Sequence, residues 1–90
     1  MVTERRESTL RTAVSWVGKE VRLELAIIQG KPKEVIEAAT NLGLDEESIM
    51  LACAAAHKWA GARFLVQGRN EEAKRELDAA ENIIANFTIR

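Results

Sequence analysis

The chain has too few cysteines to form an internal disulfide and no apolar run long enough to span a membrane. It contains 1 cysteine and therefore forms no internal disulfide, so a reducing, cytoplasmic setting is the simplest prediction. The longest apolar run, Ile49 to Ala56, is far shorter than the roughly 20 residues that a membrane-spanning helix needs. The segment from Met1 to Glu7 carries charges of both signs and no apolar stretch, so we identify no signal peptide.

An excess of charge of one sign is also absent. The sequence has 13 Lys and Arg against 14 Asp and Glu, which gives a net charge of −1. Proteins that bind nucleic acids usually present a basic field that releases counterions from phosphates. We interpret the small basic cluster of Arg5, Arg6 and Arg11 as a solvated helix face. We therefore expect neither a nucleic acid nor a membrane as the partner, and no small-molecule substrate or cofactor is evident.

Glycine and proline are scarce, and they fall where helices are expected to end and begin. The triplet Gln29-Gly30-Lys31 recurs as Gln67-Gly68-Arg69, 38 positions later, and Pro32 follows the first of them. No strand pattern appears. We predict an all-α fold in one domain, residues 1–90, whose four helices form two antiparallel hairpins over about 8–42 and 45–87. The first predicted helix ends near Gln29, the second covers 33–41 and the third covers 46–67. The third and fourth helices are expected to start from caps at Asp45 and Asn70.

The first predicted helix carries two apolar stripes. The stronger stripe consists of Leu10, Val14, Val17, Val21, Leu25 and Ile28. A second stripe, about 100° around the axis and interrupted by Glu20, consists of Ala13, Trp16, Leu23 and Ile27. A helix that is apolar over so wide an arc needs neighbours on two sides, and one of these can be another molecule.

The other helices differ in how they are expected to pack. The second and fourth helices show one inward side each: Val35, Ile36, Ala39 and Leu42 on the second, and Ala73, Leu77, Ala80, Ile84 and Phe87 on the fourth. The third helix is rich in alanine, which lets helix axes approach closely, so we predict that it is central. Its Trp59 is then expected in the core. Trp16 is the candidate for contact with a partner, and packing under the N-terminal segment is its open alternative.

The second half of the chain carries small and aromatic residues at a regular spacing, namely Gly61, Phe64, Gly68, Ala73, Leu77 and Ala80. On these residues, the segment of about 54–84 resembles a tetratricopeptide repeat, a family of paired antiparallel helices of about 34 residues per unit. The resemblance implies that Gly61 and Ala73 let two helices touch, and that Leu77 and Ala80 pack against a next hairpin. The first half is similar in architecture only, with Gly30 as its one clean match.

The resemblance also implies a binding groove lined by the first helix of each hairpin. The residues that it places there are Glu20, Glu24 and Ile27 from the first hairpin and Lys58, Ala62 and Leu65 from the second. Some members of the family grip a terminal carboxylate with lysine and asparagine, but the two glutamates here would repel that group. A partner segment with a basic side chain suits them better. Simple solvation of Glu20, Glu24 and Lys58 remains the alternative.

A rival pattern overlaps the joint between the hairpins. Its residues have the spacing of a helix-turn-helix: Ala38, Ala39, Leu42, Gly43, Leu44 and Ile49. This pattern gives the alternative function, a DNA-binding regulator that uses residues 35–52. However, Asp45, Glu46 and Glu47 would then face phosphates, which they repel, and the same turn is needed simply to connect two packed helices.

No constellation in the sequence indicates catalysis or a metal site. Cys53 and His57 lie four positions apart, but two ligands do not close a zinc site and the chain has no other Cys or His. We interpret them as a small buried thiol beside a tolerated histidine. The predicted function is therefore a non-enzymatic adaptor or chaperone-like subunit that binds a segment of another protein, or a second copy of itself.

Overall fold

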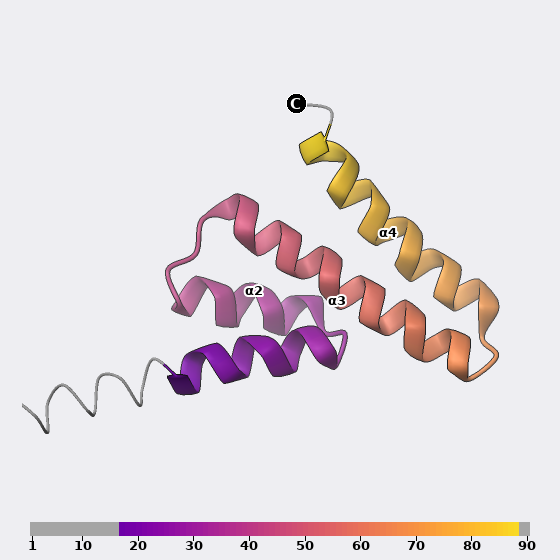
Figure 1. The fold of residues 1–90 in the computed structure, drawn as a ribbon, viewed down its shortest axis with the longest axis horizontal. Helices are drawn as coiled ribbons and strands as arrows, with labels where there is room; N and C mark the ends of the chain where they lie inside the picture. Colours follow the sequence, from indigo (N-terminus) through magenta and orange to yellow (C-terminus); the bar gives the residue numbers. More distant parts are fainter. Residues whose placement is uncertain (1–16, 89–90) are drawn as a thin grey trace, which may run out of the picture.

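The computed structural model describes residues 17–88, and this part of the chain is all-α, as the sequence predicts. The first helix covers 17–28 and is followed by α2 (Pro32–Asn41), α3 (Glu46–Val66) and α4 (Asn70–Thr88) (Figure 1). The predicted bounds of the second and third helices agree with these to one residue at each end. Figure 1 shows the first helix and α2 as one antiparallel hairpin and α3 and α4 as another, with α3 lying between α2 and α4.

The repeated triplet around Gly30 and Gly68 closes two of the helices in the same way. Gly30 has φ = 68° and Gly68 has φ = 76°, the left-handed region that costs glycine nothing. At Gly30, the N–H of Lys31 donates to the carbonyl of Ala26 at 3.0 Å, and the N–H of Gly30 donates to Ile27 at 3.0 Å. The corresponding pair of hydrogen bonds closes α3 at Gly68. Both joints are therefore Schellman caps, and Gly43 closes α2 in the same way, so the cap explains the glycine of the triplet and not its flanking residues.

Different groups cap the N-terminal ends of α2, α3 and α4. Pro32 occupies the first turn of α2, where its missing N–H is not needed. The carboxylate of Asp45 accepts a hydrogen bond from the N–H of Ser48 at 2.9 Å, so the predicted cap of α3 is confirmed. The predicted cap at Asn70 is displaced by one residue. Asn70 is already inside α4, and the carbonyl of Arg69 accepts the first hydrogen bond, from Ala73.

Small residues bring the helices together. The core cluster consists of Leu23, Ala26, Val35, Ala39, Cys53 and Ala56, drawn from the first helix, α2 and α3. Between α3 and α4, a Cβ atom on Gly61 would lie 2.9 Å from the side chain of Leu77 and 3.3 Å from the carbonyl of Ala73. Gly61 thus permits the close contact expected within the second hairpin, and α3 is the central helix as predicted. Leu77 packs inside its own hairpin here, on Gly61.

The first helix packs on the core through the weaker of its two apolar stripes, not through the stronger one. Its weaker stripe faces the core, where Leu23 is 9% exposed, whereas Val21 on the stronger stripe is 45% exposed. Ala26, on the buried side, is 4% exposed. Hydrophobic periodicity gives the angle of a stripe on its own helix but does not say which side meets a neighbour. The side that carries Ala26 faces the core because its small side chain lets the axis of the first helix approach its neighbours closely.

Two further predictions of burial were wrong. Ile36 is 46% exposed, because the ten-residue α2 buries only a narrow side, centred on Val35 and Ala39. Trp59 was expected in the core and is 49% exposed. It lies on the central helix, but α2, α4 and the first helix cover only part of the circumference of α3.

Candidate protein-binding face of α3

One side of α3 is apolar and uncovered by any helix within residues 17–88. Large apolar side chains on this side are 43% (Leu51), 49% (Trp59) and 89% (Val66) exposed. They recur every three to four residues together with alanines, so they form a single row along the helix. We call this row, consisting of Leu51, Ala55, Trp59, Ala62 and Val66, the open face. Leu65, 51% exposed, and Lys58 lie along its edge.

The open face exists because α3 is apolar around its whole circumference. The segment 49–66 contains three side chains that can carry charge, His57, Lys58 and Arg63. A helix of this composition is normally enclosed on all sides. Here two sides are enclosed and the third is not. Exposed apolar rows of this kind are a recognised mark of interaction sites.

Two of those three polar side chains bind other parts of the protein. Arg63 donates to the carbonyls of Ile28 at 2.7 Å and Gln29 at 2.9 Å, the free carbonyls at the end of the first helix. The Nδ1 atom of His57 lies 2.6 Å from Oε2 of Glu76 on α4. Lys58 has no ion-pair partner among the described residues. It therefore stands as a free cation at the edge of the open face.

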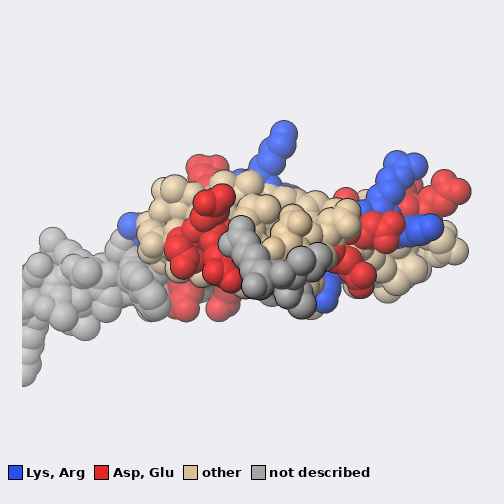
Figure 2. Space-filling view, turned by 90° about the horizontal axis from the view of Figure 1, so that it is seen from above, with Lys and Arg blue, Asp and Glu red and all other residues tan. Residues whose placement is uncertain are grey.

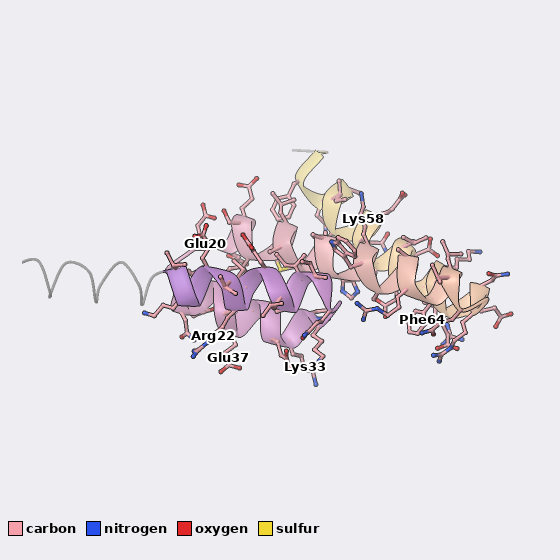
Figure 3. All side chains as sticks on the ribbon, turned by 60° about the horizontal axis from the view of Figure 1, so that its bottom comes forward. Glu20, Arg22, Lys33, Glu37, Lys58 and Phe64 are labelled. Atoms are coloured by element: carbon pink, nitrogen blue, oxygen red, sulfur yellow. The ribbon has the colours of Figure 1, made fainter. Side chains whose placement is uncertain are left out.

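The structure places most of the predicted partner-binding residues on accessible positions. Glu20 and Lys58 project to the same side of the molecule, whereas Arg22, Lys33 and Glu37 project to the opposite side (Figure 3). Ala62 and Leu65 are exposed, as is Glu24. Ile27 packs partly against the core cluster, so less of it is available to a partner. Trp16 lies outside the described residues.

Sequence reasoning missed Leu51 and Val66 and placed Trp59 in the core. A signal was present, because the four-residue steps from Leu51 through Ala55 to Trp59 mark one side of a helix. It was obscured by the equally apolar residues on the other two sides of α3. With no polar side for reference, periodicity does not tell a buried side from an open one.

A shallow groove between the first helix and α2 was also not foreseen. It has a volume of about 310 Å³. Its lining consists of Arg22, Leu25, Ala26 and Gln29 from the first helix and Glu34, Glu37, Ala38 and Asn41 from α2. It lies on the side of the molecule to which Arg22 and Glu37 project (Figure 3).

Cys53 and His57 serve different contacts and do not converge on a common ligand. Cys53 is 3% exposed, its sulfur lies 3.9 Å from the carbonyl oxygen of Pro32, and burial raises the pKa of its thiol. His57 turns instead toward Glu76 on α4. Within residues 17–88, no group of three or more His, Cys, Asp or Glu side chains is placed to hold a metal ion.

The segment of the rival helix-turn-helix pattern is acidic and accessible. Asp45, Glu46 and Glu47 are exposed, and the hydrogen bond from Ser48 lowers the pKa of the Asp45 carboxyl, so that it stays ionised near neutral pH. Residues 35–52 contain no lysine or arginine. Seen from above (Figure 2), acidic side chains gather toward the end of the molecule where α3 begins, and no continuous basic surface is visible.

Among the described helices, none combines the length and the apolar character that a membrane span requires. Comparisons with known proteins add no relative: no family model, no curated protein and no solved structure matches this chain.

Proposed function

We propose that this protein is a non-enzymatic interaction module, a small adaptor or chaperone-like subunit of the cytoplasm, that binds a segment of another protein along the open face of α3. The observation that supports this proposal is the row of exposed apolar side chains on that central helix, which includes Trp59 at 49% exposure and Val66 at 89%. Tryptophan is enriched among residues that dominate binding energy, and Trp59 lies near the middle of the row.

The size of the open face suits a short segment. Burying a large apolar side chain fully is worth about 2 kcal/mol, so covering one that is already half buried gains about 1 kcal/mol. Leu51, Trp59, Leu65 and Val66 together then supply a gross gain of about 5 kcal/mol, and association costs at least about 4 kcal/mol, so the partner segment must bury apolar side chains of its own to bind. An amphipathic helix of the partner can lie along α3 and pack its own apolar stripe against such a row. The alanines between the large side chains of the open face leave room for the partner's large side chains.

Charges select among partner segments. Glu20, which projects to the same side of the molecule as Lys58 (Figure 3), favours a partner segment with a basic side chain. Lys58 favours an acidic group near the middle of α3. The weight of the proposal rests on the apolar row, since exposed charges contribute little on their own.

The alternative, a DNA-binding regulator that uses residues 35–52, is disfavoured by charge. This segment has Glu37, Asp45, Glu46 and Glu47 and no basic residue to neutralise phosphates. Titration of labelled duplex DNA at low salt tests it. Affinity that is high there and falls steeply as salt rises would favour the regulator over the interaction module.

Site-specific photo-crosslinking tests the proposal directly. A benzophenone side chain is placed at Ala62, on the open face, and separately at Glu37, which projects to the opposite side (Figure 3). Both variants are expressed at the natural level in the source cell and irradiated. We expect discrete adducts from Ala62 that are absent from Glu37, and we expect Trp59→Ala to reduce them. Equal labelling at both positions, or none at Ala62, would contradict the proposal.

A matched pair of substitutions separates binding from folding. Leu65→Ala truncates a 51% exposed side chain beside the open face, and Ile36→Ala truncates a 46% exposed side chain on α2. The two changes have similar effects on the free chain because the exposures are similar. Only Leu65→Ala is expected to reduce the adducts formed at Ala62.

A further inference from the structure

The first helix presents a second apolar surface, separate from the open face. Val17, Val21, Leu25 and Ile28 are 52%, 45%, 49% and 44% exposed. They recur at intervals of three and four residues on the side of the helix opposite Leu23, which packs in the core. We call this row the outer stripe. It is the most regular apolar row in the first helix, and nothing within residues 17–88 covers it.

We propose that the outer stripe is a dimer interface, in which two copies of this chain pair through their first helices, side by side and in parallel. A two-fold interface uses the same patch on both copies, so the patch must be complementary to itself. A row of aliphatic side chains with no charge within it meets that condition. The apolar residues of the outer stripe are not those of the open face, so either proposal can fail without the other, and Glu20 is the one side chain that both assign to a partner.

Two features identify a second copy as the occupant. The first is net charge, since a charge of −1 leaves little long-range repulsion between copies.

The second feature is charge complementarity at the edges of the stripe, and it also sets the direction of pairing. Glu20 projects to one side of the first helix and Arg22 to the other (Figure 3). When the two-fold axis runs along the helices, which are then parallel, the Glu20 edge of one copy faces the Arg22 edge of the other. Antiparallel helices would bring Glu20 toward Glu20 and Arg22 toward Arg22. Opposite charges are thus juxtaposed only in the parallel pair.

Sedimentation equilibrium of the full chain and of two matched variants tests the interface. Val21→Asp places a carboxylate in the stripe, and Ile36→Asp places one at a position of similar exposure, 46% against 45%, on α2. Two unpaired carboxylates would lie in one apolar contact, so we expect Val21→Asp to weaken dimerisation at least about 100-fold. Ile36→Asp should leave it unchanged. A monomeric parent chain, or equal effects of both substitutions, would overturn the proposal.

Disulfide trapping tests the parallel direction. Val17→Cys and Ile28→Cys lie near the two ends of the described stripe. In a parallel pair each cysteine meets its own equivalent, and both variants should form covalent dimers under mild oxidation. In an antiparallel pair, equivalent ends lie about 16 Å apart and neither variant should link. Failure of both to link overturns the parallel arrangement. The native Cys53 does not compete, because it is buried.

Discussion

Replacing Gly30 with alanine tests whether the turn between the first helix and α2 rests on α3. Gly30 has φ = 68°, and a Cβ atom there would lie 2.8 Å from the Cβ of Ala60 and 3.1 Å from its Cα and N atoms. Gly68 provides a matched control, because its φ is 76° and a Cβ atom would have nothing within 4 Å. Alanine at either position must adopt the left-handed backbone conformation, which costs about 1 kcal/mol of folding free energy.

The difference between the two variants isolates the contact with Ala60. Overpacking a tight contact costs typically about 1–3 kcal/mol, and the atoms that would have to move belong partly to the backbone of α3. We therefore expect Gly68→Ala to lose about 1 kcal/mol of unfolding free energy and Gly30→Ala to lose about 3 kcal/mol. For a domain of this size, stability is small enough that such a loss is a large part of the total.

Urea denaturation followed by far-UV circular dichroism measures both losses. The dependence of the unfolding free energy on urea should be the same in the two variants, because both lose the same surface on unfolding. If Gly30→Ala and Gly68→Ala cost the same within about 0.5 kcal/mol, the turn does not pack against Ala60 and the placement of the first hairpin on α3 is wrong.

Three further outcomes follow from the contacts. Arg63→Ala should lower the unfolding free energy by up to about 1 kcal/mol in the same assay, because it removes two hydrogen bonds from a charged donor that tie α3 to the end of the first helix; no loss would show that the side chain is solvated. Asp45→Ala should destabilise the chain at neutral pH: the pKa of Asp45 is lowered in the folded state, so its contribution is present above the carboxyl pKa of the unfolded chain and disappears as pH falls through the lowered value. A variant whose deficit persisted unchanged in acid would rule out that origin. Trp59→Ala should cost clearly less than the roughly 3–5 kcal/mol typical of a fully buried tryptophan, because Trp59 is 49% exposed; a loss in that range in thermal or urea unfolding would place Trp59 in the core.

The elements of this fold were predictable because their ends carry local signals. Gly30 and Pro32 mark one joint and Asp45 marks the start of α3, and each acts through backbone geometry or hydrogen bonds within a few residues. Such signals do not depend on the rest of the molecule. Helix bounds therefore came out to about one residue where the structure describes both ends.

The faces of the helices were harder to predict, because they depend on neighbours that are distant in sequence. The outward direction of Val21 follows from the close approach that Ala26 allows on the other side of the first helix. The exposure of Trp59 follows from the number of helices available to surround α3. Neither fact is encoded in the spacing of residues along one helix.

The central claim is that the open face of α3 is uncovered in the free chain, and Trp59 reports on it directly. The sequence has 2 tryptophans, so Trp16→Phe leaves Trp59 as the single indole emitter. The measurement is quenching of its fluorescence by acrylamide in the dilute, monomeric protein. Because Trp59 is 49% exposed, we predict red-shifted emission and acrylamide quenching between that of a buried tryptophan and that of an indole in water. Blue-shifted emission that acrylamide hardly reaches would show that the face is already covered, and would contradict the account.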